Sequence, residues 1–68
     1  MNFTANDVGA LVLNQAGEIL EIRQFLKYDG GVIELLARSG LSYRARACGQ
    51  YWGEVAIPDL NIVARFKQ

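Results

Sequence analysis

Two adjacent aromatic residues are the clearest candidates for contact with another molecule. Tyr51 and Trp52 stand between Gly49 and Gly53, in a stretch with the composition of a loop. Tyrosine and tryptophan supply a large contact area at low conformational cost and are enriched at binding hot spots. The pattern therefore predicts a contact site here. It favours Tyr51, because a tryptophan at this position could equally fill the end of the core.

Arginines in the preceding segment indicate a second kind of contact. Arg44 and Arg46 alternate along residues 41–48, so on an extended chain their side chains share the outward face. Combined with Tyr51 or Tyr28, they would form a surface that stacks bases and contacts phosphates, as in proteins that bind single-stranded nucleic acid.

The same arginines have a structural alternative. Arg23, on a neighbouring segment, could extend them into a basic stripe, but Glu21 and Glu34 could instead pair with them across strands. The chain has 7 basic and 7 acidic residues and therefore no net charge. Because binders of the nucleic-acid backbone usually carry a basic excess, the balance favours ion pairing.

Apolar side chains on the segment at residues 18–26 form a third candidate. On a regular strand, Leu20, Ile22 and Leu26 share one face, so Phe25 and Ile19 are expected on the outward face. If both are exposed, they make an apolar patch suited to a protein partner or to a second copy of the chain.

The parts of an enzyme or metal site are missing from the sequence. There is no histidine, no nucleophile elbow and no glycine-rich phosphate loop opening a helix. Glu18 and Glu21 fall on opposite faces of an extended segment, so they do not pair as acid and base. Cys48 is the only cysteine, which leaves no internal disulfide and no second thiol for a metal. We therefore predict no catalytic activity, no cofactor and no metal.

Glycine spacing indicates the elements that position these residues. Turns at Gly17, at Asp29 with Gly30 and at Ser39 with Gly40 separate apolar runs of strand length. The predicted strands are residues 8–14, 18–26, 32–37, 41–48 and 62–66, with a short 3₁₀ turn at residues 58–61. A helix over about residues 32–39 is the alternative, which would make the class α+β, because Val32, Leu35 and Leu36 also fit helical spacing and Gly40 fits a helix C-cap.

Length and composition limit the organisation. The chain has 68 residues, of which 51% are hydrophobic, enough for one compact core and no second one. We expect a single domain over residues 1–68, with the polar residues 1–7 as an N-terminal arm. That start lacks the basic and apolar regions of a signal peptide, and no apolar run approaches the ~18 residues of a membrane span. A cytoplasmic location is the expectation.

From Val8 to Phe66 the layout resembles the Src-homology-3-like small β-barrels. The likeness rests on the opening run at residues 8–12, the hairpin return at residues 17–22 and the run at residues 57–63. It implies an all-β, five-stranded barrel with a 3₁₀ turn before the last strand. The acidic loop of the peptide-binding members has no counterpart here. Plasmid-type type II dihydrofolate reductases are similar in size, but residues 55–58 depart from their cofactor-binding stretch at two positions, so their activity is not implied.

Together these observations predict a non-catalytic binding module, suited to a small accessory, inhibitory or regulatory protein. Contact with a protein partner or self-assembly is the first expectation, because the charge is balanced and the candidate residues are aromatic and aliphatic. Binding of RNA or single-stranded DNA through an arginine and tyrosine face is the alternative. The candidate partner-binding residues are Tyr51, Trp52, Arg44, Arg46, Phe25 and Tyr28.

Overall fold

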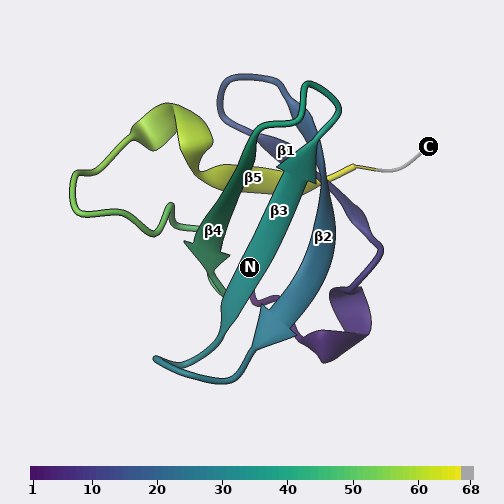
Figure 1. The fold of residues 1–68 in the computed structure, drawn as a ribbon, viewed down its shortest axis with the longest axis vertical. Coiled ribbons are helices and arrows are strands. Elements are labelled where there is room, and N and C mark those ends of the chain that lie inside the picture. The colour runs from purple at the N-terminus through teal and green to yellow at the C-terminus, as the bar shows by residue number, and fades with distance from the viewer. Residues whose placement is uncertain (67–68) are drawn as a thin grey trace.

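Within residues 1–66 the chain folds into short strands joined by tight turns, together with two 3₁₀ helices (Figure 1). The computed structural model describes residues 1–66; residues 67 and 68, the end of the predicted domain, lie outside the described residues. The elements in chain order are η1 (Ala5–Asp7), β1 (Leu11–Asn14), β2 (Ile19–Leu26), β3 (Val32–Ala37), β4 (Ser42–Arg46), η2 (Pro58–Leu60) and β5 (Ile62–Arg65).

The five strands form one antiparallel sheet in the order β4-β3-β2-β1-β5. This confirms the all-β class, with a 3₁₀ turn before the last strand. The expected closure into a barrel does not occur, because no ladder joins β4 to β5 within residues 1–66. After β4 the chain turns back and lies along that strand's own edge, through a bridge between Ala45 and Tyr51. The edge that β5 would need is therefore occupied.

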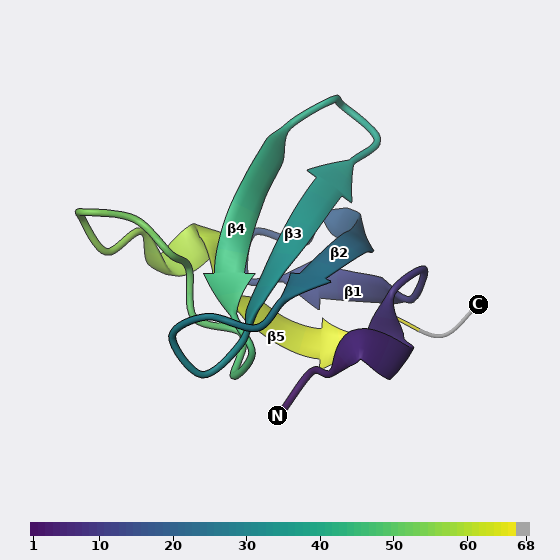
Figure 2. The ribbon, with the colours of Figure 1, turned by 60° about the horizontal axis from the view of Figure 1, so that its bottom comes forward.

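Twist nevertheless brings the two ends of the sheet near each other. In Figure 2, β5 passes close to the end of β4, and the two strands run in clearly different directions. The Ile62 N–H donates to the Gly49 carbonyl at 2.7 Å, so the start of β5 is tied to the turn after β4. The result is a strongly curved open sheet whose concave side holds the core.

The helix considered for residues 32–39 is not formed. β3 pairs with β2 on one side and β4 on the other, so its backbone groups are used by ladders. Ile33, Leu35 and Ala37 are buried in the core, at the alternate positions of a strand. The helical spacing of Val32, Leu35 and Leu36 was therefore misleading, and tertiary pairing outweighed it.

A bulge in β2 overturns the expected position of Phe25. Ile22 pairs with Leu35, but the next pair is Gln24 with Glu34, so Arg23 is an extra residue in the ladder. One extra residue exchanges the two faces of the strand beyond it. Phe25 therefore turns inward, where it is half-buried and packs against the core.

The N-terminal segment takes part in the core, which its polar composition did not predict. Phe3 is 1% exposed, and its N–H donates to the Ala47 carbonyl at 2.8 Å. The remaining buried core side chains come from all five strands: Val12, Leu20, Ile22, Ile33, Leu35, Ala37, Ala45 and Ile62. Phe3 is thus part of the core, while the other residues of the segment are exposed or half-buried.

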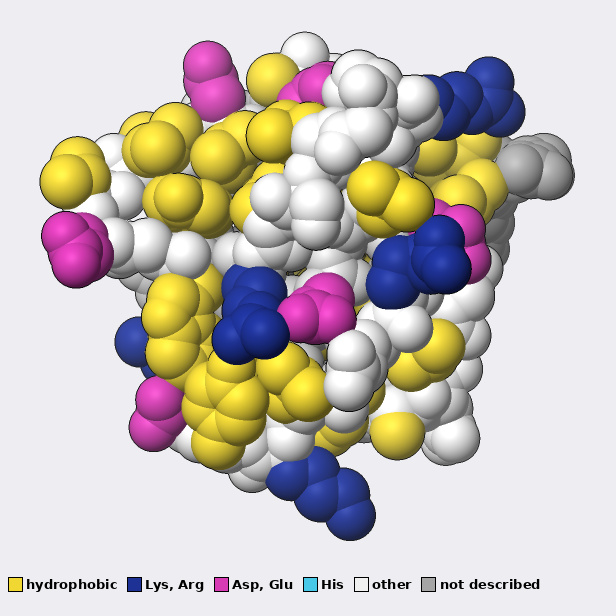
Figure 3. All heavy atoms as spheres, in the orientation of Figure 1, with side chains coloured by type: hydrophobic (Ala, Val, Ile, Leu, Met, Phe, Trp, Pro, Cys, Tyr) yellow, Lys and Arg dark blue, Asp and Glu magenta, His cyan; other side chains and the backbone are white. Residues whose placement is uncertain are grey.

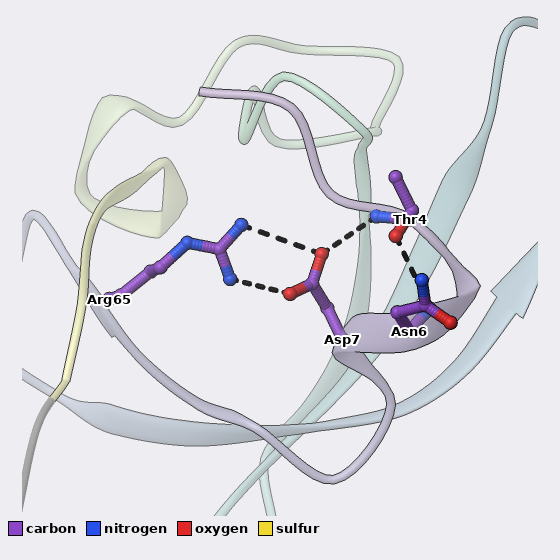
Figure 4. Close-up of polar contacts among 4 residues, drawn as sticks. All are labelled: Thr4, Asn6, Asp7 and Arg65. Carbon is purple, nitrogen blue, oxygen red and sulfur yellow. Dashed lines mark hydrogen bonds and ion pairs between the residues drawn. The ribbon is translucent and has the colours of Figure 1, made fainter.

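An ion pair fixes this segment to the last strand (Figure 4). The Arg65 Nη1 donates to Asp7 Oδ1 at 2.6 Å, and the Arg65 guanidinium also lies over the Phe3 ring, 4.7 Å from its centre. The Thr4 N–H donates to Asp7 Oδ2 at 2.8 Å. The hydrogen bond from Arg65, followed by that from Thr4, lowers the pKa of Asp7 below its ordinary value.

A buried asparagine connects the first hairpin to η2. Asn14 is 1% exposed; its Oδ1 accepts from the Glu18 N–H at 2.8 Å, and its Nδ2 donates to Glu18 Oε1 and Tyr43 Oη. The Tyr43 hydroxyl in turn donates to the Leu60 carbonyl at 3.0 Å. Burial, which disfavours the phenolate, is the largest cause raising the pKa of Tyr43. The network holds η2 in place and so anchors one end of the loop that precedes it.

Candidate protein-contact surface

The segment at Tyr51 and Trp52 is held against the edge of β4 by backbone hydrogen bonds. The Arg46 N–H donates to the Gln50 carbonyl at 2.8 Å, and the Trp52 N–H donates to the Arg44 carbonyl at 3.0 Å. The turn that allows this contains Gly49, which has φ +100°. A Cβ at Gly49 would lie 2.8 Å from the Ile62 carbonyl oxygen, so glycine is needed for both conformation and space.

Tyr51, the favoured contact residue, is half-buried and bonded within the protein. Its N–H donates to Asn61 Oδ1 at 2.7 Å, and its ring meets the Tyr43 ring edge-on at 5.8 Å between centres. A Cβ at Gly53 would overlap the Tyr51 ring, which explains the second glycine of the stretch. These contacts give Tyr51 a part in packing the loop.

Trp52 instead joins the outer face of the sheet and does not fill the core. Its ring meets the Tyr28 ring edge-on at 5.5 Å between centres, and the Arg46 guanidinium lies over it at 4.7 Å. Tyr28, in the β2–β3 turn, is 43% exposed. The structure therefore brings together four predicted site residues and Glu34, which we call the Tyr28–Trp52 cluster: Tyr28, Glu34, Arg44, Arg46 and Trp52.

Arg44 is engaged inside this cluster. Its Nη2 and Nε lie 2.8 and 3.0 Å from Glu34 Oε2, and its Nη1 donates to the Tyr28 hydroxyl at 2.6 Å. The hydrogen bond to Glu34 is the largest cause raising the pKa of Arg44. The ion pair considered from the sequence thus forms, and it uses most of the donors of Arg44.

The three-arginine stripe is not formed. β3 lies between β2 and β4, so Arg44 of β4 is not next to a residue of β2. In the row across the sheet, Arg44 pairs with Glu34, and Glu34 pairs with Gln24. Arg23 is the extra residue at the bulge of β2. The row across this face therefore contains one acidic side chain, Glu34, between the neutral Gln24 and the basic Arg44.

Two apolar side chains, Val32 and Leu26, share the outer side of the sheet with Arg46 of the cluster. Val32 faces away from the core by strand alternation, yet it is 0% exposed. Val32 pairs with Leu26 of β2 and with Arg46 of β4, and the Arg46 guanidinium lies over the Trp52 ring. Trp52 is half-buried, so part of its side chain is enclosed by the fold and part remains exposed.

Residues 53–57 expose apolar side chains that the sequence analysis did not single out. Val55 is 71% exposed and Ile57 is 42% exposed. In the described part of the chain, no backbone hydrogen bond involves residues 53–56, and the loop projects from the body of the molecule (Figures 1 and 2). Figure 3 shows hydrophobic side chains gathered on this side, over the loop before η2. The sequence contains a signal for this exposure, because Pro58 ends the apolar run at residues 55–57 and disfavours a central strand there.

Phe25 and Ile19, the two apolar side chains expected on the outward face of β2, do not form an exposed patch. Phe25 packs inward, and Ile19 is half-buried beside Ala37, at the opposite end of β2. Cys48 is exposed.

Comparison with family models, with curated proteins and with solved structures finds no match to this chain. Among residues 1–66 no helix is both long and apolar enough to cross a membrane.

Proposed function

We propose that this protein is a non-catalytic binding domain that acts by protein–protein contact. The contact surface is the exposed part of Trp52 and Tyr28 together with Val55 and Ile57 in the adjoining loop. The observation that carries the proposal is the exposure of Val55 and Ile57 on a projecting loop, in which residues 53–56 make no backbone hydrogen bond within the described part of the chain.

Energetics favour a role in contact with another molecule. Fully burying a valine or isoleucine side chain gains about 1.5–3 kcal/mol, and this fold leaves most of that gain unused at Val55. The neighbouring Trp52 is already oriented by Arg46 and Tyr28, so a partner would order it at little entropic cost. Tryptophan, tyrosine and arginine are the residues most enriched at interface hot spots, and Trp52, Tyr28 and Arg46 are of these types.

We extend the proposal to the fold and the biological setting. The strand order, with β5 beside β1 and a 3₁₀ turn before β5, supports kinship with Src-homology-3-like proteins in an open form. A single small domain of this kind suits an accessory, inhibitory or regulatory protein, and a cytoplasmic one. Because such folds serve many functions, the contact surface carries the functional argument and the fold does not.

Binding of RNA or single-stranded DNA is the second candidate. The stacking of Arg46 on Trp52 favours it, since a cation beside an aromatic face can hold both a phosphate and a base. Against it, Glu34 neutralises Arg44 on the same face. Fluorescence anisotropy with a labelled oligonucleotide at low and high salt tests it: steeply salt-dependent affinity supports this function, and no binding at low salt removes it.

Affinity capture tests the first proposal. The immobilised protein should retain a specific partner from cell lysate, and Tyr28→Ala combined with Val55→Ser should lose it. Val63→Ser is the matched control, because Val63 is 49% exposed on β5, outside the proposed surface. If the surface variant retains the same proteins as the control, this surface does not bind them.

A further inference from the structure

One shallow pocket lies at the end of the sheet where two turns come together. It has a volume of about 220 Å³ and is lined by Gly17, Glu18, Ile19, Ala37, Arg38 and Ser39. Ile19 and Ala37 give it an apolar part, and Arg38 is exposed beside them. A cavity of ~150 Å³ accommodates a molecule as large as benzene, so this pocket has room for one aliphatic side chain.

The pocket is lined by one charged side chain of each sign, Arg38 and Glu18. Arg38 takes part in no ion pair within residues 1–66. Glu18 also lines the pocket, but its carboxylate accepts a hydrogen bond from Asn14 Nδ2 at 3.0 Å. Arg38 is therefore the charged group most free to meet a ligand, and it favours an anionic one.

The projecting loop has the complementary composition. Val55, its most exposed side chain, directly follows Glu54, and Asp59 lies just beyond the loop. Residues 47–64 contain these two acidic residues and no lysine or arginine, although the whole chain is neutral. Like Arg38, neither carboxylate forms an ion pair in the part of the chain that the structure describes.

We propose that Val55 inserts into this pocket on a second copy of the chain, with Glu54 meeting Arg38. This inference rests on the proposed binding by protein contact and names a second copy as the partner. The apolar part of the pocket suits Val55, Arg38 beside it, unpaired within residues 1–66, suits Glu54, and zero net charge leaves little repulsion between two copies of the chain. The contact joins two different surfaces, so it either closes reciprocally between two copies or continues into larger assemblies.

Sedimentation analysis of the purified protein tests the proposal. A contact this small is expected to be weak, so the mean mass should rise above the 7.5 kDa of one chain over roughly 10 µM to 1 mM. Val55→Asp should weaken the association at least about tenfold. Val8→Asp is the matched control, because Val8 is 47% exposed in another loop and should associate like the native chain.

Reversing the charges of Arg38 and Glu54 tests whether these two side chains pair. Arg38→Glu and Glu54→Lys should each weaken association, and the double variant carrying both should recover it. If circular dichroism shows that Val55→Asp has lost its fold, Val55→Ser replaces it. A protein that stays monomeric at about 1 mM overturns the proposal. So does self-association that neither the Val55 nor the Arg38 variant weakens, because another surface is then responsible.

The two proposals fail separately. If the protein remains monomeric but the Tyr28→Ala and Val55→Ser variant loses a captured partner, binding by protein contact stands and the second copy is wrong. If self-association follows the predicted variants and no other protein is captured, the surface serves assembly alone.

Discussion

The hairpin end around Asn14 and the loop at residues 53–57 differ in whether their side chains find partners within the protein. Around Asn14 a polar group is 1% exposed, and its amide oxygen and nitrogen both bond to neighbouring residues. In the loop, apolar groups are left in water, with Val55 71% exposed. In the first region, the polar groups form hydrogen bonds that stabilise the fold. The second contributes little to the fold, which is the reason for assigning it to contact with another molecule.

The turn at Gly49, which is bonded to the start of β5, should be more sensitive to substitution than either region. Gly49→Ala places a Cβ against the Ile62 carbonyl at a backbone φ of +100° and should destabilise the fold by about 3 kcal/mol in urea titration. Gly40→Ala is the control, since Gly40 has a similar φ of +93° and open space around it. The control should cost about 1 kcal/mol. Equal losses would show that conformation alone matters at Gly49.

Removing one hydroxyl should break the polar network. Tyr43→Phe leaves the Leu60 carbonyl and one Asn14 N–H without their partner, at a cost of about 1–2 kcal/mol in urea titration. Because burial raises the pKa of Tyr43, its contribution is present below about pH 10 and declines as pH rises through the folded pKa. The difference between native and variant should therefore shrink in strong alkali. A constant difference would contradict the assigned role of the hydroxyl.

Acid should reveal the ion pair that holds the N-terminal segment. The lowered pKa of Asp7 means that its contribution is present above its unfolded pKa of about 4 and is lost as pH falls through the folded value. Asp7→Asn should thus lower the unfolding temperature at neutral pH, and the two proteins should converge in strong acid. If their unfolding temperatures differ equally at both pH values, the carboxylate is not responsible.

The loop should give the smallest change in stability. Val55→Ser with Ile57→Ser should alter the free energy of unfolding by less than about 0.5 kcal/mol, since both side chains are exposed. A loss comparable to that of Tyr43→Phe would show that the loop supports the fold after all.

Local sequence signals predicted the strands and turns well, because glycines with positive φ and alternating side chains act within a few residues. The same rules failed at Phe25, since the bulge at Arg23 depends on how β3 pairs with β2. Long-range contacts decided the rest. The pairing of Arg44 with Glu34 was an alternative that the sequence offered, whereas nothing local indicated that Phe3 would enter the core. For the candidate site, aromatic composition singled out Tyr51, Trp52 and Tyr28 and favoured Tyr51, while Val55 and Ile57 were not among the predicted contact residues.

Photo-crosslinking in cells tests the central claim most directly. A photoreactive amino acid placed at position 55 should yield a covalent adduct larger than the 7.5 kDa chain, formed with a partner protein or with a second copy. The same group at position 8 should yield none. An absence of adducts from position 55, or equal adducts from both positions, would contradict the assignment of this loop to protein contact.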